Sequence, residues 1–357
     1  MESGGGVERG TRASYLPAFP MKHETLSTMR VGLIYDLFEN YPWEPGEAPD
    51  ADAENEPPET VAALAAALET LGHTPVRVGT AYDLLRRMPA LDFDAAVNIA
   101  EGARGRNREA YAPVLLEMAG VPFLGSDALT LSLSLDKAWT KDLAVAAGVR
   151  TPPYRTYASA DAVAEADLPG PFPLFVKPRY EGSSKGITAA SKVRTVAELR
   201  REAARIVTTY RQEALVETFV GGGGEFTVAV VGNAPPEPLP ALQRAVEVET
   251  GIGLHALDRR SMPPRAWAYT LEGRLTPALE AELRSLAVRI YEKLACKDFA
   301  RIDFRVDGEG RPWFLEINPL PTFAPDGTFA ILAELTGKPY PAFLAEVLER
   351  GFRRLGV

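Results

Sequence analysis

Several residue types are scarce in this chain of 357 residues, and each scarcity excludes a class of site or protein. The single cysteine, Cys296, excludes an internal disulfide framework and any zinc site built from cysteines. The three histidines, His23, His73 and His255, argue against a multi-histidine metal cage. The longest clearly apolar run, residues 61–68, is far too short to span a membrane.

Basic charge is also scarce, with 39 Lys and Arg against 48 Asp and Glu and a net charge of −9. An isoelectric point near 5.2 argues against a nucleic-acid partner, which would need a basic face. Hydrophobic residues at 46% and charged residues at 24% are typical of a globular protein, and the length predicts two or three domains. Residues 1–28 lack the apolar segment of a signal peptide, so we expect a flexible tail and a cytoplasmic location.

Residues 29–130 alternate strand and helix signals. Short apolar runs typical of buried parallel strands occur at residues 31–35, 76–78 and 95–99. Between the first two, residues 61–71 repeat apolar side chains at helical spacing and end before Gly72. This order predicts an open parallel α/β sheet. No GxGxxG motif follows the first strand, so a dinucleotide site there is unsupported.

The loop after the first strand, residues 39–59, carries eight acidic residues, no basic residue and many prolines. Removing these eight from the 48 acidic residues leaves 40 against 39 basic ones, so the negative charge is local. One interpretation is a solvated, flexible insertion, since long loops in compact domains are disordered or functional. The other is a lid over a substrate site that screens or recognises a cationic amine.

A joint at Pro152 and Pro153 separates this region from an α+β region. We expect strands at residues 174–177, 214–219 and 225–231, helices at 136–147, 195–210, 277–295 and 341–354, and a hairpin at 299–318. With residues 309–310 as a two-residue loop, the hairpin carries one apolar face made of Ile302, Phe304, Val306, Trp313, Leu315 and Ile317.

The other face of this hairpin predicts a metal site. In the same register Asp303 lies opposite Glu316, and Arg301 lies opposite Asn318. Two opposed carboxylates repel each other unless a cation lies between them. The oxygen ligands of Asp303, Glu316 and Asn318 suit Mg²⁺, which completes its shell with water and substrate phosphates. A ladder of surface salt bridges is the alternative interpretation.

A second candidate element is the loop RYEGSSKG, residues 179–186, which follows the predicted strand ending at Lys177. Its backbone N–H groups and the hydroxyls of Ser183 and Ser184 can wrap phosphate oxygens, while Lys177 adds positive charge. An ordinary surface turn is the alternative, and the spacing of a Walker A loop is absent.

Four segments in this order resemble the ATP-grasp superfamily, and most of all its D-alanine–D-alanine ligase branch. They are DKAWTK (136–141), LFVKPRYEGSSKGI (174–187), LVETFVGGGGEFTVAVVG (215–232) and ARIDFRVDGEGRPWFLEINPLP (300–321). The resemblance covers nearly all of residues 30–350. It implies a three-domain α/β and α+β fold in which two domains clamp ATP: an N-terminal parallel-sheet domain at 29–130 with the insertion at 39–59, a central domain at 131–216 and a C-terminal domain at 217–357.

The resemblance also implies roles for individual residues. Those at the ATP phosphates would be Lys137 and Lys177, with Ser183, Ser184 and Gly186 in the loop over the γ-phosphate. Those at adenine and ribose would be Glu217, the backbone of Thr218 and Val220, and Glu225. The ligands of Mg²⁺, with two ions expected and Mn²⁺ able to substitute, would be Asp303, Glu316 and Asn318. The catalytic groups would be Arg301, facing an acyl phosphate, and Ser183.

The substrate side departs from the D-alanine–D-alanine ligase pattern. A His-Gly pair of that branch is Glu101-Gly102 here, its Gly-Met-Thr run is residues 319–326, and its Lys-Tyr loop is residues 255–261. The ammonium-binding glutamate of the branch corresponds to Glu54 or Glu56. Glu101 either recognises a substrate ammonium or pairs with a nearby arginine, which could be Arg104, Arg106 or Arg108.

We therefore predict an ATP-dependent ligase that joins amino acids, or an amino acid and a small carboxylate, through an acyl phosphate, with a specificity different from D-Ala-D-Ala. A homodimer is left open as its assembly, and no nucleic-acid or membrane partner is expected. The alternatives are a nucleotide-binding regulatory module that has lost ligation and a phosphotransferase on the same fold.

Overall fold

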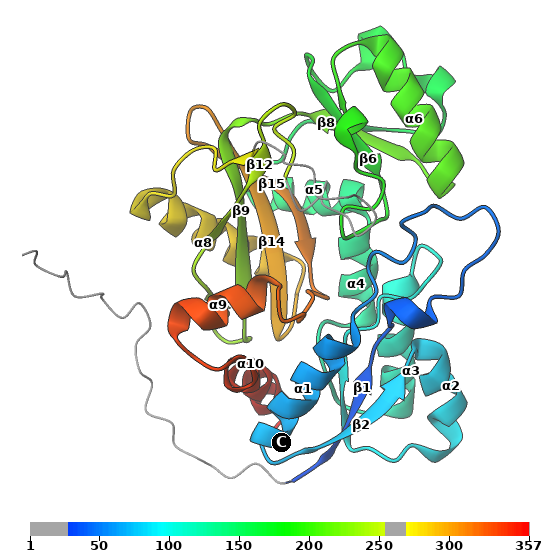
Figure 1. Ribbon diagram of the computed structural model, residues 1–357, viewed down its shortest axis with the longest axis vertical. Coiled ribbons are helices and arrows are strands. Elements are labelled where there is room, and N and C mark those ends of the chain that lie inside the picture. Colours follow the sequence, from blue (N-terminus) through cyan, green and yellow to red (C-terminus); the bar gives the residue numbers. More distant parts are fainter. Residues whose placement is uncertain (1–27, 254–268, 357) are drawn as a thin grey trace, which may run out of the picture.

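Figure 1 shows the computed structural model of the chain, which describes residues 28–253 and 269–356. Residues 1–27 of the expected tail and the segment 255–261 lie outside the described residues. None of the helices in the described ranges combines the length and apolar character needed to cross a membrane.

The N-terminal part is built on a parallel sheet with the strand order β2-β1-β3-β4. Its strands are β1 (Arg30–Ile34), β2 (Thr74–Gly79), β3 (Ala95–Asn98) and β4 (Phe123–Leu124), and its helices are α1 (Pro58–Thr70), α2 (Ala81–Arg87) and α3 (Tyr111–Ala119). Successive side chains of β1 enter two different cores, because Leu33 packs with Leu64 of α1 and Ile34 packs with Leu84 of α2. The predicted open parallel sheet is confirmed.

The last helix of the chain, α10 (Tyr340–Leu355), returns to this N-terminal sheet and packs along α1 (Figure 1). Leu348 and Phe352 of α10 share one hydrophobic core with Val31 and Leu64. The two ends of the described chain are therefore held together by apolar burial between distant segments.

A second sheet, antiparallel with the order β5-β8-β6-β7, lies in the middle of the chain. Its strands are β5 (Tyr154–Tyr157), β6 (Leu174–Pro178), β7 (Lys192–Val193) and β8 (Ala214–Thr218). The amphipathic helix α6 (Val196–Tyr210) covers it, with Leu199 and Ile206 buried against Val176 and Val216.

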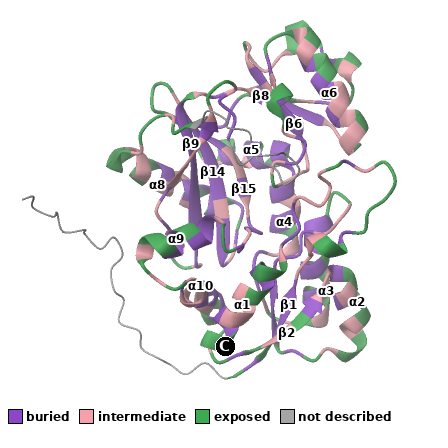
Figure 2. Ribbon diagram, in the orientation of Figure 1, coloured by how far each residue is buried: buried purple, intermediate pink, exposed green. Residues whose placement is uncertain are grey.

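A third sheet has the order β10-β9-β14-β15, with β11 also paired to β9. Its strands are β9 (Gly222–Val231), β10 (Glu237–Pro238), β11 (Leu242–Arg244), β14 (Phe299–Asp307) and β15 (Pro312–Asn318), and a separate pair is formed by β12 (Val246–Glu247) and β13 (Tyr269–Thr270). The helices nearby are α4 (Ala128–Leu135), α5 (Lys137–Ala146), α8 (Pro277–Lys293) and α9 (Thr328–Thr336). Figure 2 shows β9 and β14 buried along most of their length. Side chains from α5 and α8 pack on the apolar face of this sheet, which leaves its polar face for a site.

Short 3-10 helices complete the described elements: η1 (Phe38–Asn40), η2 (Met88–Ala90), η3 (Arg108–Ala110), η4 (Ala160–Ala162), η5 (Glu165–Asp167) and η6 (Ala189–Ser191).

Side-chain caps set the starts of the predicted helices. Asp136 accepts hydrogen bonds from the backbone N–H groups of the first turn of α5, Thr195 caps α6, and Thr276 caps α8. Such caps satisfy N–H groups that have no partner inside the helix, typically contributing about 1 kcal/mol each. The predicted helix starts at residues 136, 195 and 277 agree with these caps within one residue.

The hairpin loop differs from its prediction. The N–H of Asp307 donates to the carbonyl of Arg311 at 3.1 Å, so the loop contains residues 308–310 and not two residues. Gly310 supplies the left-handed conformation, with a φ of 82°, that such a three-residue loop needs.

A bulge at Leu315 then shifts the register between Asp303 and Phe304, so that Phe304 pairs with Phe314. The predicted apolar face is therefore wrong on β15, where Phe314 is buried while Trp313 and Leu315 are only half-buried. Because the bulge offsets the longer loop, the predicted pairing at Asp303 is correct.

Candidate active site

Two carboxylates face each other on the polar side of the hairpin. Asp303 pairs in register with Glu316, and Arg301 pairs with Asn318. Asp303 accepts hydrogen bonds from Thr227 Oγ1 at 2.5 Å and from Arg301 Nη2 at 3.0 Å. Burial opposes the charge of Arg301, but Asp303 and Glu316 raise the pKa of its guanidinium. The carboxylates of Asp303 and Glu316 and the amide oxygen of Asn318 offer a hard, oxygen-only donor set, which fits Mg²⁺.

Lys137 connects this metal face to the loop 180–186. It begins α5 and is 7% exposed, and its Nζ lies 3.2 Å from Glu316 Oε2. The same Nζ donates to the backbone carbonyl of Glu181. A buried ammonium at a helix N-terminus, beside a candidate metal face, is suited to contact phosphate oxygens.

Two lysines and one glutamate form a buried cluster, and two of its members line the same cavity as Asp303 and Glu316. Glu217 accepts Lys141 Nζ at 2.6 Å and Lys177 Nζ at 2.7 Å, and Lys141 also donates to Thr151 at 2.8 Å. Burial would raise the pKa of Glu217, but the two lysines lower it to about 2. Burial lowers the pKa of Lys141 to about 8. Lys141 was missed at the level of sequence, although its spacing of four residues from Lys137 on one helix could have pointed to it.

Six of the nine predicted nucleotide-binding residues line one cavity between the second and third sheets, whereas Lys137, Ser183 and Gly186 are not in its lining. Its apolar walls are Phe175, Ile187, Phe219, Val220, Ile252 and Leu315, and its polar walls are Lys177, Ser184, Glu217, Thr218, Glu225, Asp303, Arg305 and Glu316. A cavity with apolar walls at one end and cationic and carboxylate side chains at the other is suited to a nucleotide. The apolar walls would contact the base, and the charged end would hold the phosphates.

An adjacent cavity contains the catalytic candidate Ser183, while Arg301 is not in its lining. Its lining includes Lys137, Ser183, Asn318, Glu101 and Glu316. Glu316 lines both cavities, so the two meet at the metal face. Two cavities thus lie beside one candidate Mg²⁺ position.

The loop 180–186 has strained backbone where it faces these cavities. Ser183 and Ser184 have left-handed φ values of 43° and 58°, which cost a residue with a side chain about 1–2 kcal/mol each. Such strain persists where surrounding contacts impose it, commonly at ligand-binding sites.

Those contacts come from the acidic insertion, residues 39–59. Glu54 accepts Lys185 Nζ at 2.7 Å and the N–H of Gly182 at 2.5 Å, while Asp50 accepts the N–H of Gly186 at 2.9 Å. Glu54 and Glu56 are buried. The interpretation of this segment as a solvated insertion is therefore wrong, because its carboxylates meet the unpaired donors of the loop. Gly186, predicted to lie over the γ-phosphate, has its N–H directed to the insertion.

Three buried glutamates gather beside the loop: Glu54, Glu101 and Glu109, whose carboxylate oxygens lie within 4.8 Å of one another. Burial would raise the pKa of Glu54, but Arg108 and Lys185 lower it to about 2. Burial and the neighbouring carboxylates raise the pKa of Glu101 and raise that of Glu109 to about 7. Glu109 was not identified from the sequence.

The nearby arginines do not form ion pairs with Glu101 in the part of the chain that the structure describes. Arg104 instead binds Glu44 and Glu47, Arg106 binds Asp136, and Arg108 binds Glu54 and Glu181. The alternative prediction, that Glu101 forms an ion pair with one of these arginines, is therefore wrong. Two neighbouring acids without their own cation form a pocket that would be stabilised by a bound ammonium group.

Glu56 lies at the entrance to α1 and not in either cavity lining. Its Oε2 accepts hydrogen bonds from Thr60 at 2.7 Å and from Thr322 at 2.9 Å. It thereby links the insertion to the segment that follows Asn318, a predicted Mg²⁺ ligand. Burial raises the pKa of Glu56 to about 7.

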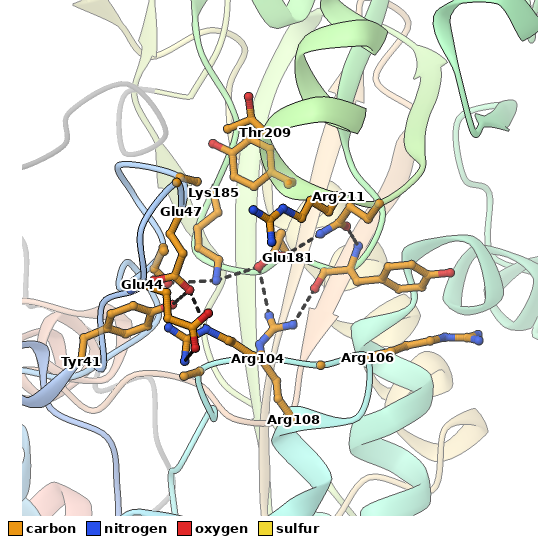
Figure 3. A pocket seen from close by; sticks show the side chains of 18 of the residues that line it. Tyr41, Glu44, Glu47, Arg104, Arg106, Arg108, Glu181, Lys185, Thr209 and Arg211 are labelled. Carbon is orange, nitrogen blue, oxygen red and sulfur yellow. Dashed lines mark hydrogen bonds and ion pairs between the residues drawn. The ribbon is translucent and has the colours of Figure 1, made fainter.

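A further cavity of about 520 Å³ lies behind the loop 180–186 (Figure 3). Glu44 and Glu47 of the insertion form one side, Arg211 lies on the other, and Glu181 lies between them. The Glu181 carboxylate accepts hydrogen bonds from Arg108 and Gln212 and pairs with Lys185. The walls of this cavity thus include the contacts that hold the loop.

Known proteins match most of the chain in sequence. Residues 143–349 match the family model for the D-ala D-ala ligase C-terminus. The uncharacterised protein y4sG of Sinorhizobium fredii is 33% identical over 304 residues, covering 82% of this chain and 87% of that protein. A D-alanine–D-alanine ligase of Stutzerimonas stutzeri is 32% identical over 289 residues, covering 81% and 87%.

Solved structures match it in fold. A D-alanine–D-alanine ligase from Bacillus anthracis complexed with ATP superposes with a TM-score of 0.67 at 22% identity, covering 91% of this chain and 98% of that one. The VanG D-Ala:D-Ser ligase from Enterococcus faecalis superposes with a TM-score of 0.69 at 20% identity, covering 91% and 99%. The predicted ATP-grasp fold is confirmed by this likeness.

Proposed function

The chain belongs to the D-alanine–D-alanine ligase family, and we propose that it is an ATP-dependent carboxylate–amine ligase releasing ADP and phosphate. Its substrates would be two amino acids, or an amino acid and a small carboxylate. The observation that carries the proposal is the opposed pair Asp303 and Glu316, which lies where the nucleotide cavity meets the glutamate-lined cavity.

The residues present support distinct roles in that reaction. Asp303, Glu316 and Asn318 would hold Mg²⁺, expected as two ions, and the bound metal would supply positive charge for phosphoryl oxygens. Lys137 and Lys177 would bind phosphate oxygens and so orient the nucleotide.

Around the reacting carboxylate, Arg301 and Ser183 are the proposed catalytic groups. Arg301 has its charge favoured by Asp303 and Glu316, so it would neutralise the substrate carboxylate and the charge that develops as the acyl phosphate forms. Ser183 would donate its hydroxyl hydrogen from the lining of the glutamate-lined cavity. Closing this cavity keeps water from the activated acyl group.

Specificity is proposed to reside in the glutamate-lined cavity. Glu101 and Glu109 have no ion-pair partner among the described residues, and each carries a raised pKa, so an ammonium group would allow both to ionise. Glu56 would act indirectly, because it accepts a hydrogen bond from Thr322 and so positions the segment that follows Asn318. We therefore propose a substrate specificity different from that of D-alanine–D-alanine ligases.

The cellular location and the domain boundaries of the enzyme are also proposed. We propose a cytoplasmic enzyme whose domains are residues 29–130, 131–216 and 217–357. A homodimer stays a prediction.

The test is a coupled assay for ADP and phosphate with Mg²⁺, ATP and a panel of D- and L-amino acids and dipeptides, followed by mass spectrometry of the products. We expect ADP release that needs both a carboxylate and an amine substrate, and a product with a new amide bond. Asp303→Asn is the test variant, since it keeps the size of the side chain and removes the proposed metal-binding charge. It should abolish turnover, and an unchanged circular dichroism spectrum would show that it is still folded.

Other outcomes would contradict this function. A stable phosphorylated product without a new amide would identify a phosphotransferase. ATP binding with no substrate-stimulated ADP release across the panel would identify a regulatory module. Full activity in Asp303→Asn would refute the metal assignment.

A further inference from the structure

A row of three charged residues crosses the third sheet at the nucleotide cavity. Glu225 on β9 pairs in register with Arg305 on β14 and, on its other side, with Arg244 on β11. Glu225 and Arg305 are buried and Arg244 is half-buried, so the row places one guanidinium group on each side of a carboxylate. Neither arginine belongs to the residues to which the family resemblance assigns a role.

Arg305 is buried without adequate hydrogen-bond partners. Its side chain is 6% exposed, and its Nε and Nη2 atoms have no hydrogen-bond acceptor among the described residues. Glu225 Oε2 lies 3.6 Å from Nη1 and Glu272 Oε2 lies 4.0 Å from Nη2, both beyond hydrogen-bond distance. Buried donors are normally satisfied, and leaving charged ones unpaired is costly. The arrangement therefore points to a partner that residues 28–253 and 269–356 do not supply.

The position of Arg305 restricts what that partner is. Its guanidinium lies 4.7 Å from the ring centre of Phe219, and both residues line the nucleotide cavity. It lies two residues along β14 from Asp303, or about 7 Å at the rise of an antiparallel strand. Arg305 thus lies between the apolar wall and the metal face, at the level of the sugar of a nucleotide that spans the cavity.

The nearby carboxylate selects among groups at that level. A phosphate beside Arg305 would also meet the negative charge of Glu225, which opposes its binding. A hydroxyl can donate to Glu225 and accept from Arg305 at the same time, because it carries one hydrogen and two lone pairs. A diol therefore matches this pair of side chains better than an anion does.

We propose that Arg305, together with Glu225, binds the ribose hydroxyls of the nucleotide and makes the enzyme selective for ribonucleotides. This inference rests on the proposed function, since it requires ATP in the cavity. Arg305 is a binding residue in this assignment, and its unpaired N–H groups gain acceptors only when the ribose is present.

Calorimetric titration with ATP, 2′-deoxy-ATP and 3′-deoxy-ATP in the presence of Mg²⁺ tests the assignment without knowledge of the amino-acid substrates. The wild type should bind ATP more tightly than at least one deoxy analogue. Arg305→Met should weaken ATP binding by about tenfold to a hundredfold, the loss expected for hydrogen bonds from a charged group. The same substitution should weaken the binding of that deoxy analogue much less. The preference for ATP over the analogue should therefore be smaller in Arg305→Met than in the wild type.

Two further variants control for folding and general charge. Arg311→Met removes an exposed arginine of the same hairpin and should bind all three nucleotides as the wild type does. Arg305→Lys keeps the charge but loses the planar fork, so its selectivity should fall between those of the wild type and Arg305→Met.

The results distinguish a failure of this inference from a failure of the proposed function. Equal affinity of the wild type for ATP and both deoxy analogues would overturn the inference whether or not the variants fold. Equal weakening of all three nucleotides by Arg305→Met would also overturn it, because the contact would then be to phosphate or to the fold. A wild type that binds no ATP would instead overturn the proposed function.

Discussion

Replacing Glu56 by glutamine should stabilise the protein at neutral and alkaline pH and change little in acid. The Glu56 side chain is buried and accepts hydrogen bonds from Thr60 and Thr322. Burial raises its pKa from an ordinary value of 4.5 to about 7; the charge of Asp326 raises it further, and the two threonine hydroxyls lower it. No cation is among the groups that shift it. The carboxylate form is therefore poorly tolerated in the folded protein.

The expected magnitude follows from proton linkage. Between pH 4.5 and about 7, folded Glu56 keeps a proton that the unfolded chain has released, so the free energy of unfolding falls as the pH rises. The slope is about 1.4 kcal/mol per pH unit. Ionisation of Glu56 thus costs the wild type roughly 3 kcal/mol above pH 7 and less than about 1 kcal/mol near pH 5. Glutamine keeps an oxygen for both threonines and has no charge to bury.

The assay is urea unfolding followed by tryptophan fluorescence, at about pH 5 and about pH 8. Glu56→Gln should gain roughly 2 kcal/mol or more over the wild type between these pH values. Glu59→Gln is the matched control, because it makes the same substitution at an exposed residue of the same segment. A difference between Glu56→Gln and the wild type that stays constant with pH would refute the reasoning.

Two further predictions concern buried ion pairs. Lys185→Met should loosen the contact between the acidic insertion and the loop 180–186, because it removes one of the two cationic partners of Glu54 and leaves only Arg108. Limited proteolysis should then cut the insertion faster than in the wild type or in Lys297→Met, which replaces a partly exposed lysine. Unchanged cleavage would contradict this clamp. Glu217→Gln should lower the free energy of unfolding by about 3–5 kcal/mol because it leaves buried ammonium groups such as that of Lys141 unpaired. A loss below about 1 kcal/mol in urea unfolding would show that the cluster does not depend on that charge.

Local patterns predicted much of the fold because helix periodicity, caps and turn residues act between near neighbours. The strand β1 and the helices α1, α5, α6 and α8 lie where apolar spacing and capping residues indicated them. The hairpin shows the limit of this reasoning. The predicted pairing of its polar residues was correct, but the three-residue loop and the bulge at Leu315 were missed. The longer loop shifts the register by one residue and the bulge shifts it back, so the pairing at Asp303 is the same as with a two-residue loop.

The buried charges of the site could not be predicted in this way. The sequence left open whether residues 39–59 are a solvated insertion or a lid, because the partners of Asp50 and Glu54 lie more than 100 residues further along the chain. Glu109 looks like an ordinary surface acid in the sequence, and only its burial beside Glu101 makes it part of the site. Arg305 likewise has no local signal for an unpaired side chain, since its burial depends on three neighbouring strands.

By itself, the sequence of this protein determined which residues share a strand face or a helix turn, and its motifs indicated an ATP-grasp ligase. That part depends on short-range geometry, which repeats every two residues in a strand and every 3.6 in a helix. Only the tertiary structure decided which charges meet and which are left unpaired, including the binding of the acidic insertion to the loop 180–186. Those pairings depend on burial between distant segments, where the loss of water makes each contact either strongly favourable or costly.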